Sequence, residues 1–434
     1  MGKKIKILVV GSDARTHALT WKLSGPDRKI YVAPGNTGIA QIAKCLAIKS
    51  DDLESLTKWA AKFRPDLTIV GPEDPLIAGI VDKFRAEGQI IFGPTKLAAR
   101  IEGSKIFSHE VMNLVGVPHP EGWIFLEGQK QLAFDRVKKE GYKNIVIKAD
   151  GACRGKGAVL PASQKEAEET INEMMAGTKY GEAGRSILIQ KRLKGNVREI
   201  SVMAIVSPKG DYQFLPVATD NKTIYDPSPK IKYNPNTGGM GGHAPQDEVG
   251  QKLLNQIKSR IFTPVLKGVA KLGCPYSGIL YANIMLTADG PKVLEFNCRS
   301  GDPETEIQMP LIENDLYEIL VSCATGKKKV GRLKFKKGFT AGVVLAAKGY
   351  PDSEKLVKGD QIFGLDKDFG PNHWVFQYAA KAEGDKMVTN GGRILEVIAF
   401  HPDSKEGALK EAYAMIGEDG IHFKGMQYRK NLVY

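Results

Sequence analysis

The first hundred residues repeat one pattern, in which a short apolar run reaches a glycine- or proline-containing turn and a helical stretch follows. The apolar runs cover residues 6–10, 30–33, 67–70 and 89–92, and the helical stretch after the first run includes residues 17–23. Strands that alternate with helices predict a parallel, doubly wound sheet with helices on both faces. Ligands of such sheets bind at the carboxyl ends of the strands, where these turns lie.

The chain has 434 residues, which is too long for one hydrophobic core and predicts several domains. The strand–helix alternation changes near residue 103, and a lysine-rich stretch at 327–337 precedes a third region. That region has apolar runs at 339–346 and 394–400 and a helical stretch at 405–416. We therefore expect an α/β and α+β multidomain protein. Its predicted parts are an N-terminal α/β domain at 1–103, a central domain at 104–330 and a small mixed α/β domain at 331–434.

The charge balance favours anionic ligands, because 62 lysines and arginines against 49 acidic residues give a formal charge of +13. A solvated lysine-rich surface explains the same number, and no basic stretch is interleaved with aromatic residues, so we expect no nucleic-acid partner. No apolar run is long enough to span a bilayer, the start does not read as a signal peptide, and the five cysteines form no paired motif. These features predict a cytoplasmic protein without a membrane partner.

The first chemical motif is a glycine- and lysine-rich hairpin at residues 145–159. A β-branched run delivers Lys148, and the loop after it has three glycines and carries Lys156. Glycines allow backbone N–H groups to approach phosphate oxygens, and the two lysines supply charge for a triphosphate. Alone, the hairpin is equally typical of a plain surface turn.

The second motif is the strand at residues 291–297. Alternation along a strand places Glu295 and Asn297 on one face and Leu294 on the other. A carboxylate and an amide beside a phosphate site suit Mg²⁺, which needs few protein ligands when phosphates supply the rest. Asn283 on the partner strand faces the same site in this interpretation, and an ordinary amphipathic strand is the alternative.

Two further stretches are candidates for substrate binding. Arg299 and Asp302 follow the strand with opposite charges, which suit either a phosphate and an ammonium group or a salt-bridged turn. The stretch 234–242 has four glycines and two asparagines, so it offers many backbone amides and has too few apolar residues for a core. A flexible surface loop is the alternative for this stretch.

Together these motifs resemble the phosphoribosylamine–glycine ligase family of the ATP-grasp superfamily over nearly the whole chain. The most specific blocks are Asn236-Thr237-Gly238-Gly239-Met240-Gly241 and Glu295-Phe296-Asn297-Cys298-Arg299. Further matching blocks are Ala33-Pro34-Gly35-Asn36, Val70-Gly71-Pro72-Glu73, Phe92-Gly93-Pro94, Glu102-Gly103-Ser104-Lys105, Lys148-Ala149-Asp150-Gly151, Gly155-Lys156-Gly157, Gly301-Asp302-Pro303-Glu304-Thr305 and Val388-Thr389-Asn390-Gly391-Gly392-Arg393. The resemblance implies that the central domain is an ATP-grasp fold with a lid subdomain at about 124–192.

The resemblance also implies the reaction. ATP phosphorylates the carboxylate of glycine, and the 1-amino group of phosphoribosylamine attacks the acyl phosphate to give glycinamide ribonucleotide, an early purine intermediate. The implied cofactors are ATP and Mg²⁺ or Mn²⁺. The implied partners are small molecules, namely an amino acid and a phosphosugar amine, and the expected assembly is a monomer or weak homodimer.

The same resemblance assigns roles to individual residues. The catalytic residues are Lys148, Asp220, Arg299 and Asp302, with the two aspartates pairing with the ammonium of glycine. The ATP contacts are Lys105, Lys148, Gly151, Gly155, Lys156, Gly157, Gln190 and Leu193, and the glycine-rich hairpin closes over the phosphates and excludes water. The metal ligands are Glu295 and Asn297. The substrate contacts are Gly11, Arg15, Gly35, Asn36, Glu73, Asn236, Thr237, Gly238, Gly239 and Gly241.

The chain departs from the family pattern at four places. The first turn reads Gly11-Ser12-Asp13-Ala14-Arg15-Thr16-His17 instead of Gly-x-Gly-Gly-Arg-Glu-His, and a solvated Asp13 would disfavour a phosphate by about 1 kcal/mol. Gln190-Lys191 replaces two glutamates that contact the nucleoside, and a lysine cannot accept a ribose hydroxyl proton. Residues 195–201 and 223–234 are longer than usual, and Asn221 replaces a histidine. These changes predict a divergent member of the family.

Other interpretations stay open at this point. The chain is alternatively a divergent ATP-grasp ligase for another carboxylate and amine, or a carboxylase of the biotin-carboxylase or carboxyaminoimidazole-forming type. The block at 236–241 argues against the carboxylases. A catalytically silent nucleotide-binding homologue would explain the changes at 190–192, but it has no chemical need for the full set of charged and polar residues named above.

Overall fold

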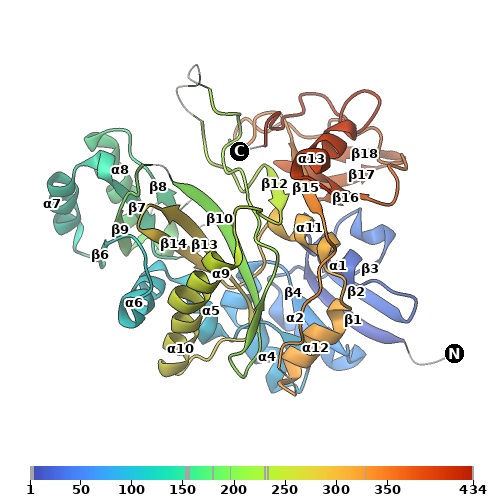
Figure 1. Ribbon diagram of the computed structural model, residues 1–434, viewed down its shortest axis with the longest axis horizontal. Coiled ribbons are helices and arrows are strands. Elements are labelled where there is room, and N and C mark those ends of the chain that lie inside the picture. The colour runs from blue at the N-terminus through green and yellow to red at the C-terminus, as the bar shows by residue number, and fades with distance from the viewer. Residues whose placement is uncertain are drawn as a thin grey trace.

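The computed structural model describes residues 4–151, 157–177, 180–195, 197–228, 231, 234–327 and 329–432. This part of the chain forms four larger sheets and one two-stranded hairpin, with helices packed between and around them (Figure 1). None of the helices in these ranges is long and apolar enough to cross a bilayer.

The N-terminal region is a five-stranded parallel sheet with the order β3-β2-β1-β4-β5. Its strands are β1 (Ile5–Gly11), β2 (Arg28–Pro34), β3 (Lys44–Cys45), β4 (Leu67–Val70) and β5 (Ile91–Phe92). The helices of this region are α1 (Ala14–Leu23), η1 (Ile39–Gln41), α2 (Leu53–Phe63), α3 (Glu73–Ala78), α4 (Ile80–Ala86) and α5 (Lys96–Gly103).

Both faces of this sheet are covered, as the strand–helix alternation predicts. Leu8 and Val10 share a core with α2 and α4, whereas Ile7 and Val9 share a core with α1 and with α12 (Leu316–Thr325). Alternate residues of one strand thus point to opposite layers.

The predicted elements differ from the observed ones mainly at their ends. β4 has the predicted bounds, whereas β5 covers only the second half of the predicted run at 89–92. Helix α1 begins before the predicted start at His17, because Asp13 caps it: the Asp13 carboxylate accepts a hydrogen bond from the Thr16 N–H at 2.8 Å.

The central region contains two antiparallel sheets. The lid sheet has the order β6-β9-β7-β8 and a core of its own with helices α7 and α8. Its elements are β6 (Gly122–Phe125), α7 (Lys130–Glu140), η2 (Tyr142–Asn144), β7 (Ile145–Ala149), β8 (Ala158–Val159), α8 (Gln164–Met175), η3 (Gly181–Gly184) and β9 (Ile187–Lys191).

The second central sheet has the order β11-β10-β13-β14 and carries the predicted metal strand at its edge. Its strands are β10 (Arg198–Val206), β11 (Tyr212–Phe214), β13 (Gly278–Thr287) and β14 (Gly290–Asn297). The other helices of the central region are α6 (Lys105–Val115), α9 (Gln251–Ile257), the π-helical turn η4 (Lys258–Phe262), α10 (Thr263–Lys271), α11 (Glu304–Gln308) and η5 (Met309–Leu311).

The C-terminal region forms an antiparallel sheet of order β12-β15-β19-β16, with α13 packed on β15 and β19. Its elements are β15 (Phe339–Ala346), β16 (His373–Gln377), the β17 (Ala380–Glu383) and β18 (Lys386–Thr389) hairpin, β19 (Arg393–His401) and α13 (Lys405–Ala414). β12 (Gly241–Ala244) comes from the stretch predicted to bind substrate, so this sheet takes one strand from the predicted central domain.

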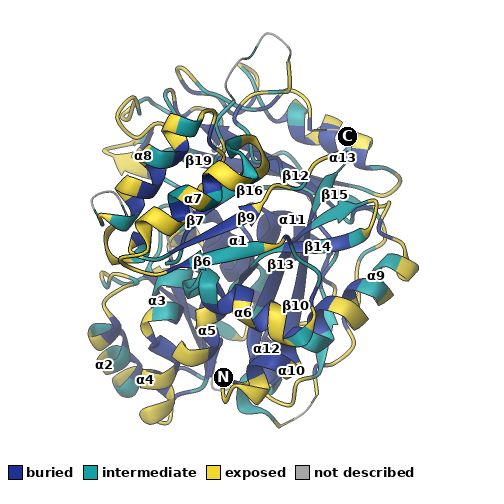
Figure 2. Ribbon diagram, turned by 90° about the vertical axis from the view of Figure 1, so that its left-hand side faces the viewer, coloured by how far each residue is buried: buried dark blue, intermediate teal, exposed yellow. Residues whose placement is uncertain are grey.

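The sheets form the interior of the molecule and the helices form much of its surface. In Figure 2 the strands β10, β13 and β15 are largely buried, whereas α7 and α8 expose their outer faces. Figure 1 shows the lid sheet at one end and the C-terminal sheet above the N-terminal one, with the second central sheet between them.

Gly241 provides a test of how β12 joins the C-terminal sheet. Its φ is +110°, and a Cβ there would collide with the Gly342 carbonyl oxygen on β15. We predict that Gly241→Ala lowers the free energy of unfolding by about 3 kcal/mol or more, the sum of backbone strain and overpacking.

The matched control is Gly210→Ala, because Gly210 has φ +80° but no atom within 4 Å of a Cβ. It should cost about 1 kcal/mol. Denaturant titration measures both, and equal losses would show that the approach of β12 to β15 is not constrained.

Candidate functional site

A cleft of about 740 Å³ lies between the lid sheet, the edge of the second central sheet and the carboxyl ends of β1 and β4. All three regions of the chain contribute to its walls. The predicted site residues that line it are Arg15, Glu73, Lys148, Gln190, Leu193, Asn236, Thr237, Gly238, Glu295, Asn297, Arg299 and Asp302.

The remaining predicted residues do not line this cleft. Lys105 lines a smaller adjoining pocket with Lys148, Gln190 and Glu295, and Asp220 lies directly behind the cleft residue Lys222. Besides Asp220, the described predicted residues that line neither pocket are Gly11, Gly35, Asn36, Gly151, Gly157, Gly239 and Gly241. Gly155 and Lys156 lie outside the described residues.

The start of α6 is fixed to the end of β7 by Asp150. Its Oδ1 accepts hydrogen bonds from Ser104 Oγ and Ile106 N, both at 2.8 Å, and its carbonyl accepts one from Lys105 N at 2.8 Å. Ser104 in turn caps α6, since its Oγ accepts from Phe107 N at 3.0 Å. These bonds place Lys105, the first residue of a helix, beside Lys148 and suit this end of the cleft to anions.

Lys148 is buried at the base of the cleft, where its Nζ donates to the Leu294 carbonyl at 3.0 Å. Burial lowers the pKa of Lys148 to about 8; Glu295 opposes this shift and Lys105 adds to it. Burial alone would raise the pKa of Glu295, but Lys105 and Lys148 hold it below its usual range. The Glu295 carboxylate is therefore ionised and faces two cations.

The predicted alternation of β14 is wrong at Leu294. The β13–β14 register pairs Asn283 with Glu295 and Ile284 with Val293, so Leu294 is the extra residue of a β-bulge. The bulge turns Leu294 into the cleft next to Glu295, whereas Val293 and Phe296 are buried in the core. Asn283, as predicted, faces the same cleft.

The donor set at β14 fits a divalent cation held together with phosphates. Glu295 supplies an ionised carboxylate, and Oδ1 of the cross-strand Asn283 is buried and accepts no hydrogen bond within the described structure. Asn297 Oδ1 accepts from Arg299 Nη2 at 3.1 Å and retains a second lone pair. No group of three His, Cys, Asp or Glu side chains in the described part converges on a metal position, so the phosphates would complete the coordination.

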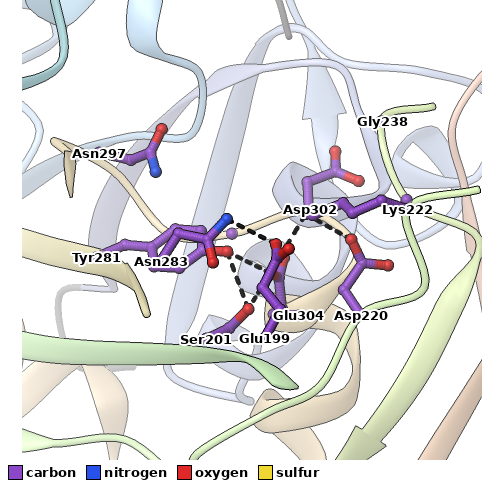
Figure 3. Close-up of polar contacts among 12 residues, drawn as sticks. Glu199, Ser201, Asp220, Lys222, Gly238, Tyr281, Asn283, Asn297, Asp302 and Glu304 are labelled. Carbon is purple, nitrogen blue, oxygen red and sulfur yellow. Dashed lines mark hydrogen bonds and ion pairs between the residues drawn. The ribbon is translucent and has the colours of Figure 1, made fainter. Parts of the chain in front are cut away.

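A buried polar network lies beside this strand (Figure 3). Glu304 Oε1 accepts hydrogen bonds from Ser201 Oγ at 2.6 Å and from the Tyr281 hydroxyl at 2.7 Å. A separate bond lies next to it: Asn283 Nδ2 donates to Glu199 Oε1 at 2.7 Å, and Asn283 is the cross-strand neighbour of Glu295.

Asp220 and Lys222 form an ion pair of 2.5 Å at the edge of the same network. Burial raises the pKa of Asp220 to about 7, because its effect is larger than the opposing effect of Lys222. The nearby Glu304 raises the pKa further. Gly239 lies against this carboxylate, since a Cβ there would be 2.8 Å from both oxygens. The predicted ammonium-binding aspartate therefore already has one cationic partner.

Two more acids of the cleft are also paired. Asp302 Oδ1 lies 2.7 Å from Arg393 Nη1, and Asp13 Oδ2 lies 2.6 Å from Arg15 Nη2. Because Asp13 is paired and caps α1, the expected repulsion of a phosphate by a solvated Asp13 does not apply. Burial opposes ionisation of Asp13, but Arg15 and the bonds from Thr16 lower its pKa.

Arg299 connects the metal strand to the N-terminal region. Its guanidinium lies 3.2 Å from Glu73 Oε2 and 3.1 Å from Glu102 Oε1, and it also donates to Asn297 Oδ1. The predicted phosphate-binding arginine is thus held between two carboxylates.

Asn36 also has a structural role, because its Nδ2 donates to the Ser12 carbonyl at 2.8 Å and to the Gln377 carbonyl at 2.6 Å. It joins the first turn to the C-terminal sheet.

Three family models match consecutive parts of the chain. They are the N domain of phosphoribosylglycinamide synthetase at residues 5–102, its ATP-grasp (A) domain at 103–305 and its C domain at 340–433. The chain belongs to the phosphoribosylamine–glycine ligase family.

Curated relatives agree with this assignment. The chain is 40% identical over 430 residues to the phosphoribosylamine–glycine ligase of Caldanaerobacter subterraneus subsp. tengcongensis, covering 99% of both chains. It is 39% identical to the enzyme of that name from Yersinia pestis, with 99% of this chain and 98% of the relative covered.

The fold agrees as well. A crystal structure of phosphoribosylamine–glycine ligase from Thermotoga maritima superposes with a TM-score of 0.82 at 28% identity, covering 99% of this chain and 100% of that one. A biotin carboxylase from Campylobacter jejuni shares the fold with a TM-score of 0.74 at 15% identity. The ATP-grasp ligases to which this family belongs use ATP with a divalent metal.

Several cleft residues of this family member were not predicted from the sequence. They are Glu199, Lys222, Tyr281, Glu304 and Arg393. Arg393 carried a usable signal, because it ends the block Asn390-Gly391-Gly392-Arg393 that matches the family, but that block alone assigns no role.

The changed pair Gln190-Lys191 lines the cleft. The Gln190 side chain is buried, whereas Lys191 reaches outward and lies 2.6 Å from Glu121 Oε2. The lysine charge is therefore directed to Glu121, and the strand still presents residues 190–193 to the cleft.

Replacing Lys148 tests the phosphate end of the cleft. We predict that Lys148→Met weakens binding of a non-hydrolysable ATP analogue about 10- to 100-fold, because a hydrogen bond to a charged group contributes about 1.5–3 kcal/mol. Calorimetric titration measures the affinity, and Lys139→Met, at an exposed site on α7, is the control. Unchanged affinity in the Lys148 variant would place the triphosphate elsewhere.

Proposed function

We propose that this chain joins glycine to 5-phosphoribosylamine with hydrolysis of ATP, giving glycinamide ribonucleotide, ADP and phosphate in purine biosynthesis. The observation that supports this most strongly is the full-length match at about 40% identity to ligases of that name, combined with a cleft that holds Lys148, Glu295 and Arg299 together. The proposal includes a cytoplasmic enzyme that acts as a monomer or weak homodimer.

The ATP end of the proposed site is the Lys105–Lys148 pocket. Lys105 and Lys148 bind the phosphates, and Gly151 and Gly157 cover them. Gln190 and Leu193 contact the nucleoside. Bound there, ATP with Mg²⁺ or Mn²⁺ supplies the phosphoryl group that activates the glycine carboxylate, and Glu295, Asn297 and Asn283 hold the cation.

The other end of the proposed site binds glycine and the phosphosugar amine. Asp220 and Asp302 supply carboxyl groups for the glycine ammonium, and Arg15 and the amides of 236–239 suit a phosphate. The positioning of two reactants in one cleft converts a bimolecular step into an effectively unimolecular one, which is the main demand of this chemistry.

A divergent substrate pair is the second candidate, and the altered turn at 11–17 is the observation that favours it. The two candidates differ in a direct assay. Purified protein should release ADP when glycine and phosphoribosylamine are both present, and not when either is absent. ADP release that does not depend on phosphoribosylamine but increases with another amine would favour the second candidate.

Replacing Glu295 tests the metal assignment. We predict that Glu295→Ala lowers kcat by more than about 100-fold, which exceeds the 10- to 100-fold cost of outer-shell changes. The thermal midpoint should stay close to that of the parent, because the carboxylate lines a cleft and not the core. Glu110→Ala on the exposed face of α6 is the control, and full turnover in the Glu295 variant would refute the assignment.

A further inference from the structure

Two carboxyl groups lie buried behind the cleft and take no part in the proposed chemistry. Glu306 belongs to α11 and Glu396 to β19, and both are completely shielded from solvent. α11 packs on β15 and β19, where Gly342 leaves room for the Glu396 side chain: a Cβ on Gly342 would collide with Glu396 Oε1 and lie 2.7 Å from Ile307 Cγ2.

Most oxygens of these two groups have no hydrogen-bond partner within the described structure. Both oxygens of Glu306 and Oε1 of Glu396 are buried and unpaired. Only Glu396 Oε2 is bonded, since the Tyr378 hydroxyl donates to it at 3.2 Å.

The cations around the pair are already matched by other acids. Arg393 pairs with Asp302, Arg15 with Asp13, and Lys222 with Asp220. The other titratable group that contacts the pair is the Tyr378 hydroxyl, whose pKa burial raises. Within the described residues, each of these cations already has another acid as its partner, so Glu306 and Glu396 have no counter-ion.

An ionised carboxylate is unstable in such surroundings, because burial without a partner costs several kcal/mol. A bound metal ion does not offset this cost, since no group of three acidic, His or Cys side chains in the described ranges converges on one position. Protonation removes the cost without any ligand.

We propose that Glu306 and Glu396 work as neutral carboxylic acids and that their neutrality keeps Arg393 paired with Asp302 at the cleft. The Arg393 guanidinium lies 4.4 Å above the Tyr378 ring and also donates to the Gly238 carbonyl at 3.2 Å. It therefore holds part of the stretch 234–242, which is predicted to bind substrate. Ionisation of Glu396 would give Arg393 a second acid to pair with and draw it away from Asp302. Glu306 and Glu396 are therefore positioning residues.

The direction of the pKa shifts agrees with the geometry. Burial raises the pKa of Glu306 and of Glu396 well above the usual value, and Asp302 raises both further. The folded protein therefore keeps protons that the unfolded chain releases above a pKa of about 4.3. Stability from these groups is fully present at acid pH and is lost as pH rises toward the folded-state pKa.

Infrared spectroscopy tests protonation directly. The band of a protonated carboxyl group should be present in the parent above pH 7 and lose intensity in Glu306→Gln and in Glu396→Gln. Glu418→Gln, an exposed site, should leave it unchanged. Identical spectra for the parent and both buried variants would overturn the proposal.

Thermal unfolding gives a second readout. The double Gln variant mimics two neutral acids. The difference between its thermal midpoint and that of the parent should therefore shift in favour of the variant as pH rises from about 5 to 8. A loss of stability in the variant that is the same at every pH would mean that the carboxylates are charged and structural, which contradicts the proposal.

A kinetic readout rests on the proposed function. The parent should show a rise in KM for phosphoribosylamine at alkaline pH with little change in kcat, and the double variant should show a flat KM. The same alkaline rise in both proteins would contradict the positioning role. Complete lack of ligase turnover in the parent would instead refute the proposed function, and the infrared result would still decide the present inference.

Discussion

The cleft depends on one half-buried arginine. Arg299 follows the metal strand directly, yet its guanidinium is bound to Glu73 at the start of α3 and to Glu102 at the end of α5. These contacts fix the carboxyl edge of the N-terminal sheet against β14. Replacing a buried ion pair by apolar side chains is often neutral, whereas removal of one partner costs about 3–5 kcal/mol. The arginine therefore specifies how the two regions meet more than it adds to stability.

Charge matching explains the rest of the site. Asp13, Asp220 and Asp302 each form an ion pair with a cation of the cleft, whereas Lys105 and Lys148 lie beside Glu295 and lower its pKa. In the proposed site this end therefore carries the positive charge that favours a nucleotide with its cation. At the other end, acids and arginines are paired with one another, and the proposed substrates would have to exchange partners with them.

The sequence predicted what is local and failed where contacts are long-range. The strands β4 and β15 follow from apolar runs, of which the first ends at Gly71, and Glu295 and Asn297 follow from alternation within one strand. Arg393 was missed because it meets Asp302 from a different sheet, and Leu294 was misplaced because a bulge depends on pairing with β13. The sequence alone leaves Asp13 as a solvated charge, because its pairing with Arg15 is defined only by the folded turn.

A structure with a non-hydrolysable ATP analogue and a divalent ion bound would test the central claim most directly. The account predicts the cation within about 2.0–2.6 Å of a Glu295 oxygen and the phosphates between Lys105 and Lys148, with the base near residues 190–193. A nucleotide bound on any other face, with β14 and the hairpin at 145–159 both untouched, would contradict it.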